Sequence, residues 1–210
     1  MSEFAPGSSG TKATPTFLQN NLKKQQNLVI ILTDDLTISN PSLISVWAVF
    51  ISYGSTPPSL NFVQIFPSES KDGRVDLMPA FSLTESKDPS PVFDKALRAF
   101  NFPIDGVIVT DAEGFNNISG WMFGNQYQLE SPISATSDNQ MGAAQMLQQF
   151  VSAACPKLTN ADPTGKTAFS WQDLIPKHFH TRMPFETMAI SWQNLSSNGT
   201  PPHCEFVQIP

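Results

Sequence analysis

Short apolar segments separated by polar, Gly- and Pro-containing turns run along most of the chain. Residues 28–32 form a continuous apolar run, which is typical of a strand buried on both faces. Residues 44–52 and 60–66 flank the turn "YGSTPPS" and predict a long β-hairpin. Residues 106–110 predict another strand, and the remaining strand candidates are the alternating residues Met188, Ile190 and Trp192 and the final segment "CEFVQIP".

Two segments have the periodicity of amphipathic helices. One begins at Ser90-Pro91, and the other is capped by Ser137 or Asp138 and ends at Cys155-Pro156. The apolar faces comprise Val92, Phe93, Ala96, Leu97 and Phe100 in the first helix, and Met141, Ala144, Leu147, Phe150, Val151 and Ala154 in the second. Residues 67–89 read as a loop, and residues 111–114 as an acidic glycine turn.

This order of elements predicts an α/β (α+β) fold with a mixed central sheet, a long β-hairpin and flanking helices. Residues 1–26 are polar and read as a flexible lead-in or linker, which leaves residues 27–210 as a single domain. At 210 residues, with 40% hydrophobic and 14% charged residues, the chain can bury a sizeable core.

Charge and hydropathy restrict the class of partner. A net charge of −6 argues against a nucleic-acid partner, because phosphate backbones are bound by basic surfaces. No apolar run approaches the roughly 18 residues of a membrane span, so we expect membrane attachment only through an anchor outside this chain. Cys155 and Cys204 permit one disulfide, the alternative being two buried thiols.

Several motifs admit both a chemical and a structural interpretation. Asp34 and Asp35 directly follow a buried strand. Two carboxylates in this position are typical of a metal site or an acid–base pair, but they also occur where a strand simply reaches water. His178, His180 and the pair His203-Cys204 could bind zinc, although loop histidines are the commoner case. The rings of "WMFGNQY" (Trp121, Phe123 and Tyr127) could stack on sugars, although such rings more often belong to a core.

The chain resembles the LytR-CpsA-Psr (LCP) family, whose members are extracytoplasmic, usually membrane-anchored bacterial proteins. They transfer glycopolymers from polyprenyl-pyrophosphate carriers to peptidoglycan. The resemblance rests on "VIILTDD", on the hairpin "SVWAVFISYGSTPPSLNFVQIFP", on "FPIDGVIVTDAEGF" and on "SDNQMGAAQMLQQF", and it is strongest over residues 27–155. It implies a family-type sandwich, with Asp35 in a metal-ligand position and Asp111 and Asp34 beside it, which could hold Mg²⁺.

The motifs that bear the family's arginines are missing. "NPSLIS" stands where the family has Arg-Ser-Asp-Thr, and Pro67-Ser68-Glu69 replaces its Pro-Arg-Asp. No Lys or Arg occurs between Lys24 and Lys71, or between Arg98 and Lys157, although a buried pyrophosphate needs cations to offset its charge.

The sequence therefore predicts a non-catalytic, extracytoplasmic binding or structural module of the bacterial cell envelope. Its partner would be a polyprenyl lipid or a cell-wall glycopolymer, and the full-length protein would be membrane-anchored or secreted. The alternative is a divergent phosphotransferase that uses Asp35, a metal ion and loop cations.

Overall fold

A computed structural model describes residues 25–68, 76–158, 177–196 and 199–207. Its centre is a six-stranded mixed sheet with the strand order β5-β4-β1-β2-β3-β6. The strands are β1 (Gln25–Thr33), β2 (Leu43–Ser52), β3 (Ser59–Phe66), β4 (Gly106–Asp111), β5 (Phe179–Thr181) and β6 (His203–Val207). The described helices are α1 (Pro91–Arg98), α2 (Ala112–Phe123), α3 (Ser137–Ala154) and α5 (Phe185–Ser196), with the 3₁₀ turns η2 (Gly124–Gln126) and η3 (Cys155–Lys157).

The predicted hairpin forms the middle of this sheet. β2 pairs antiparallel with both β1 and β3, whereas β4 pairs parallel with β1 and β6 pairs parallel with β3. This arrangement confirms the expected α+β fold with a mixed sheet and a long hairpin. Residues 28–32 of the central strand β1 are apolar because they pack into cores on both faces of the sheet, as this continuous apolar run predicts, although Ile30 is only partly buried.

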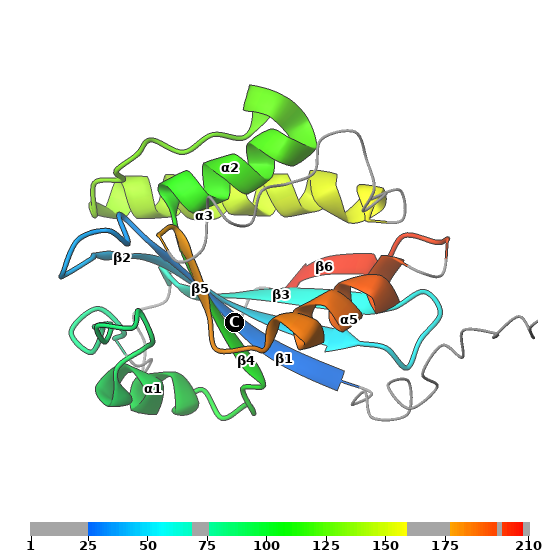
Figure 1. Cartoon of the computed structure of the whole chain (residues 1–210), viewed down its shortest axis with the longest axis horizontal. Coiled ribbons are helices and arrows are strands. Elements are labelled where there is room, and N and C mark those ends of the chain that lie inside the picture. The colour runs from blue at the N-terminus through cyan, green and yellow to red at the C-terminus, as the bar shows by residue number, and fades with distance from the viewer. Residues whose placement is uncertain (1–24, 69–75, 159–176, 197–198, 208–210) are drawn as a thin grey trace, which may run out of the picture.

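Side chains of β1 alternate between two hydrophobic cores on opposite faces of the sheet. Val29 and Ile31 pack with Phe93 and Leu97 of α1 on one face. Leu28 packs on the other face in a core that includes residues of α3 and α5. Helices α2 and α3 lie side by side over that second face, and α1 lies beneath the first (Figure 1).

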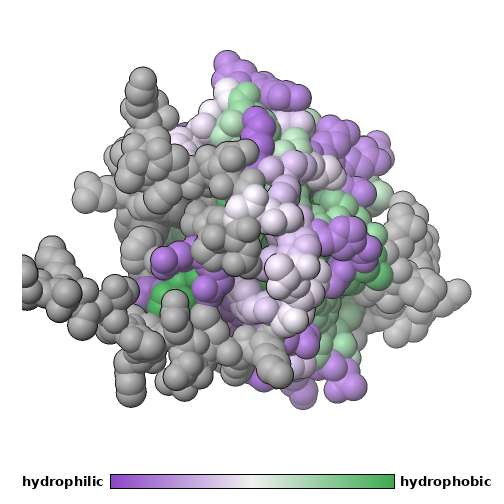
Figure 2. Space-filling view, turned by 90° about the vertical axis from the view of Figure 1, so that its right-hand side faces the viewer, coloured by the Kyte–Doolittle hydropathy of each residue, from purple (hydrophilic) through white to green (hydrophobic). Residues whose placement is uncertain are grey.

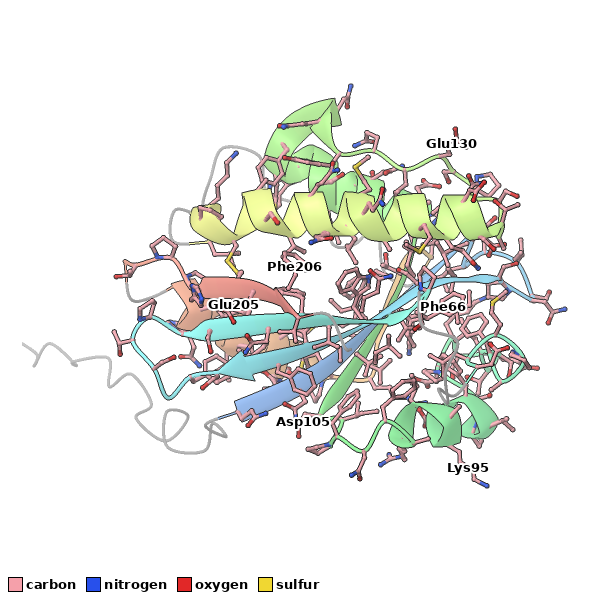
Figure 3. The ribbon with its side chains drawn as sticks, turned by 180° about the vertical axis from the view of Figure 1, so that it is seen from behind. Phe66, Lys95, Asp105, Glu130, Glu205 and Phe206 are labelled. Atoms are coloured by element: carbon pink, nitrogen blue, oxygen red, sulfur yellow. A yellow bond between two sulfur atoms is a disulfide. The ribbon has the colours of Figure 1, made fainter. Side chains whose placement is uncertain are left out.

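The far end of the sheet is fixed by a disulfide and by aromatic packing. Cys155, at the end of α3, is bonded to Cys204 of the edge strand β6, with 6.4 Å between their Cα atoms. Phe206 lies on the side of β6 that is turned toward α3, where its ring contacts those of Trp47 and Phe62 (Figure 3). Seen from the hairpin end, the described surface is mostly hydrophilic or intermediate, with small hydrophobic patches (Figure 2).

The edge strand β5 is held to the start of α1 by a group of charged side chains that we call the Arg182 clasp. Arg182 donates to Asp88 at 3.0 Å and to Asp94 at 2.8 Å, and His180 Nε2 lies 2.9 Å from Asp88. Burial lowers the pKa of Arg182, but the hydrogen bonds to Asp94 and Asp88 raise it by more, so this side chain stays charged.

Two sequence-based predictions of secondary structure are wrong. The alternating segment around Met188 is not a strand but helix α5. Residues 111–114 are not a free turn, because Asp111 caps the helix α2 that follows. The start of β1 at Gln25 also places the predicted boundary at residue 26 inside the first strand, and residues 1–24 lie outside the described part.

The other predicted elements agree with the structure to within a few residues. Ser90 caps α1 by accepting a hydrogen bond from Phe93 N–H at 3.2 Å. Helix α3 begins at Ser137, although Thr136 occupies the N-cap position without a side-chain bond. None of the described helices is long and apolar enough to cross a membrane.

Candidate functional site

The carboxylates singled out from the sequence meet at one edge of the sheet. β1 and β4 are parallel and in register, with Thr33 opposite Asp111. Their carboxyl ends therefore bring Asp34 and Asp35 to the same edge as Asp111. In open sheets with parallel strands this edge is where ligands commonly bind, so it is the first candidate site.

Asp111 is the structural centre of this edge. It is 1% exposed, and its Oδ1 accepts the N–H of Gly114 at 2.8 Å, which caps α2. Its Oδ2 accepts the backbone N–H of Leu36 at 3.0 Å and lies 2.8 Å from Nδ1 of His178. Both carboxylate oxygens are thus occupied by donors of the chain itself.

His178 comes to this edge because β5 runs antiparallel to β4, so that the start of β5 lies beside the end of β4. Its backbone carbonyl accepts the hydroxyl of Thr110 at 2.9 Å and the N–H of Asp111 at 3.4 Å. A carboxylate only accepts hydrogen bonds, so we assign a proton to Nδ1 of His178, which then donates to Asp111. Nε2 lies 3.5 Å from the exposed carboxylate of Glu113.

A glycine makes this close approach feasible. A Cβ atom added to Gly114 would overlap the carbonyl oxygen of His178 and the hydroxyl oxygen of Thr110. Gly114 therefore lets the first turn of α2 pack directly against the chain before β5, and this contact orients His178 toward Asp111.

Asp34 and Asp35 fix the loop between β1 and β2. Oδ1 of Asp34 accepts the N–H groups of Asp35 and Ser42, each at 2.7 Å. Oδ1 of Asp35 accepts the N–H and the hydroxyl of Thr37 at 2.7 and 2.6 Å. These bonds to Thr37 lower the pKa of Asp35, and the positive fields of His178 and Lys87 contribute in the same direction.

The three carboxylates do not form a ready metal site. Over residues 25–68, 76–158, 177–196 and 199–207, no group of three or more His, Cys, Asp and Glu side chains is placed to hold a metal ion. Asp111 has both oxygens engaged, and Asp34 and Asp35 each bind backbone N–H groups through one oxygen. The metal-ligand roles of Asp34, Asp35 and Asp111, and the binding of Mg²⁺, stay predictions.

The sheet beside this edge has an apolar face that is not fully covered. Ile30 and Ile108 are neighbours on the central strands β1 and β4, yet both are only partly buried. Trp47 lies opposite Ile30 on the same face, and its buried indole Nε1 has no hydrogen-bond partner. The hydroxyl of Ser45, two residues before Trp47, is likewise buried without a partner. Partly exposed apolar side chains at the centre of a sheet can form part of a ligand-binding surface, whereas the indole Nε1 and the Ser45 hydroxyl are enclosed in the core.

The residues considered for zinc have separate partners. His178 faces Asp111, His180 faces Asp88 in the Arg182 clasp, and His203 faces Glu205. Cys204 is bonded to Cys155.

Sequence reasoning did not assign His178, Glu113 and Lys87 to the carboxylate edge. Glu113 lies in the first turn of a helix that was not predicted. Lys87 reaches the edge from a loop, where its Nζ donates to the carbonyl of Ile38 at 3.0 Å. The available signal for His178 was its alternation with His180, but a three-residue strand is too short for periodicity to place.

No protein-family model and no curated protein sequence matches the chain. Several solved structures with the same fold do match the chain. TagV from Bacillus subtilis superposes with a TM-score of 0.59 at 12% identity, covering 90% of this chain and 86% of TagV. The B. subtilis protein described as the transcriptional regulator yvhJ gives 0.57 at 14% identity, with 90% and 84% covered.

A third structure of this kind is TagT bound to LI-WTA, with a TM-score of 0.56 at 9% identity, covering 89% of this chain and 79% of TagT. The chain therefore has a fold like that of the LCP proteins. At these identities the likeness concerns the fold, and function has to be argued from the site.

Proposed function

We propose that this chain is a non-catalytic LCP-like module of the bacterial cell envelope that binds the polyprenyl carrier of a cell-wall glycopolymer. The likeness to TagT, solved with a wall teichoic acid ligand, supports the class of partner. The disulfide between Cys155 and Cys204 supports an extracytoplasmic location, where such bonds persist. We place the full-length protein on the membrane or outside the cell.

The observation that supports binding is the partly uncovered sheet face at Ile30 and Ile108. A prenyl chain is a branched hydrocarbon, and burying it on this face would remove its surface from water at about 25 cal/mol for each Å². The face ends at the carboxylate edge, so a lipid bound along it would bring its phosphate toward Asp35 and Lys87.

The observation that supports a non-catalytic role is the state of the charged groups at that edge. Asp111 is fully engaged by donors of the chain, and Asp34 and Asp35 close a loop. Of three cations that the structure places, Arg182 is neutralised by two carboxylates and Lys157 lies 4.0 Å above the centre of the Phe123 ring. Lys87 reaches the edge itself, but its Nζ donates to the carbonyl of Ile38 at 3.0 Å. A leaving pyrophosphate requires cations free to stabilise its charge, and this edge is dominated by carboxylates.

The test of binding is native mass spectrometry of the purified chain titrated with a polyprenyl phosphate of defined length. We expect a one-to-one complex with the native chain. Replacing Ile108 with Trp fills the uncovered space and should weaken the complex at least tenfold. Val92→Ala is the matched control, because Val92 is an exposed apolar residue of α1 on the opposite face. No complex with the native chain, or equal binding by I108W, would refute the proposal.

The second candidate function is a divergent phosphotransferase, and the pair of Asp111 and His178 favours it. A buried carboxylate that orients an imidazole is the arrangement by which a general base is held. Under this alternative, His178→Ala and Asp35→Ala should each abolish transfer from a polyprenyl-pyrophosphate-linked glycan while the melting temperature stays nearly unchanged. Our proposal predicts no transfer by the native chain, so detectable turnover that H178A removes would overturn it.

A further inference from the structure

A shallow hollow lies on the outer surface of the α2–α3 layer, away from the sheet. It lies where η2 approaches the C-terminal half of α3, and its lining comprises Gln126, Tyr127, Gln148, Gln149, Ser152 and Ala153. Ala144, Leu147 and Val151 of the same helix belong to the core against the sheet. The hollow is therefore separate from the sheet face and from the carboxylate edge.

The chain builds this hollow by a turn at the end of α2. Gly124 has φ of 63° and ψ of −142°, a backbone conformation that favours glycine, and there the chain leaves the helix axis. Tyr127 is then held by its neighbours, with its ring centre 5.2 Å from that of Phe123 and 6.1 Å from that of Phe150. This packing fixes the tyrosine ring, so binding a ligand against it costs little side-chain entropy.

The polar groups of the hollow are neutral and largely unpaired. Gln148, Gln149 and Ser152 are exposed, and within the described structure no hydrogen bond occupies their side chains. Gln126 Nε2 donates to the hydroxyl of Tyr127 at 3.2 Å. Each amide offers two N–H donors and one carbonyl acceptor, so adjacent glutamines present alternating donors and acceptors beside an aromatic ring.

This combination selects a class of ligand. None of the six lining residues is charged, so the hollow offers nothing to offset a phosphate or a carboxylate. It offers neutral donors, neutral acceptors and an apolar ring, which match the hydroxyl groups, acetamido groups and C–H faces of a neutral sugar. We propose that the hollow is a saccharide-docking subsite, which holds one or two uncharged sugar units of a glycan. The subsite goes beyond the proposed function because it uses neither the apolar sheet face nor the carboxylates.

The test is a titration of the full ¹⁵N-labelled chain with chitotetraose, a tetramer of N-acetylglucosamine, followed by NMR. We expect a dissociation constant in the millimolar range, with the largest shifts in the side-chain amides of Gln148 and Gln149. The double variant Q148A/Q149A should weaken binding at least tenfold. Both positions are exposed on a helix and alanine is a good helix former, so the variant should fold normally.

Gln145→Ala is the matched control, because Gln145 is an exposed glutamine one turn earlier on α3 that does not line the hollow. Unchanged affinity in Q145A together with the loss in Q148A/Q149A supports the subsite. No binding by the native chain, or equal affinity in the double variant, overturns it. The I108W variant, which tests the lipid proposal, should bind chitotetraose like the native chain, so the two proposals can fail independently.

Discussion

Replacing Asp111 with alanine should be the most damaging single substitution at the carboxylate edge. The change removes the cap of α2, leaves the buried N–H of Leu36 without an acceptor and releases His178. Loss of a helix cap costs about 1 kcal/mol. A buried, unpaired N–H adds about 2 kcal/mol and a lost side-chain hydrogen bond about 1 kcal/mol, giving about 4 kcal/mol in all.

A loss of this size is a large part of the 5–15 kcal/mol that stabilises a typical domain, and for a chain of this length it should lower the melting temperature by about 10 °C. The assay is urea unfolding followed by circular dichroism, with Asp138→Ala as the control. Asp138 is also an acidic residue in the first turn of a helix, but it is exposed. If D111A and D138A lose the same small free energy of unfolding, the bonds of Asp111 do not hold this edge together.

Three further substitutions test separate parts of the fold. Gly114→Ala should destabilise the chain by about 1–3 kcal/mol, because the added Cβ overlaps the carbonyl oxygen of His178 just before β5. Gly142→Ala in α3 should stabilise it by about 0.5–1 kcal/mol, because the added Cβ meets no atom within 4 Å. Melting curves in which G142A is the less stable of the two variants would contradict this packing. Burial raises the pKa of Asp88, but hydrogen bonds in the Arg182 clasp lower it by more. The ionised Asp88 therefore stabilises the fold fully above the unfolded pKa of about 3.9, and this stabilisation is lost as pH falls through the lower folded pKa. The difference in urea midpoint between the native chain and Asp88→Asn should therefore shrink below about pH 4, and a constant difference would exclude this ionisation. Replacing Cys155 and Cys204 with serine opens a 49-residue loop and should lower the free energy of unfolding by about 4 kcal/mol. Mass measurement after alkylation, with and without reductant, shows whether the disulfide is present in the purified chain.

The strands of the sheet other than β5 were predictable because burial leaves a direct mark on sequence. Residues 28–32 of strand β1 are all apolar and pack into cores on both faces of the sheet, and the hairpin strands are separated by turn residues. Helix α5 was predicted wrongly because "MAISW" alternates over only five residues. The spacing that the fold uses is Met188, Ser191 and Leu195, which all pack toward the core at intervals of three and four.

Helix α2 was missed for a related reason. Glycine and asparagine in residues 112–120 weaken its helix propensity, and its strongest start signal, Asp111 as the N-cap, reads equally well as an acidic turn. Packing of Phe115 in a core with Leu32 of β1 and Ile44 of β2 decides in favour of the helix. Local sequence cannot report that contribution, because the packed residues are distant along the chain.

The carboxylate edge was predictable in part. The proximity of Asp34, Asp35 and Asp111 was implied by the resemblance to the LCP family, and the parallel pairing of β1 with β4 accounts for it. What each carboxylate binds was not predictable, since the partner of Asp111 is 67 residues away at His178. The uncovered face at Ile30 was also hidden, because an isoleucine has the same sequence signal whether or not a helix covers it.

One measurement tests the central claim of binding without transfer most directly. The native chain is mixed with a polyprenyl-pyrophosphate-linked saccharide, a soluble peptidoglycan fragment as acceptor and Mg²⁺, and the complex is followed by native mass spectrometry over time. Our account predicts a one-to-one complex whose ligand mass stays intact. A complex that holds the cleaved polyprenyl phosphate would show that the chain is a transferase, and the absence of any complex would show that the sheet face does not bind the lipid.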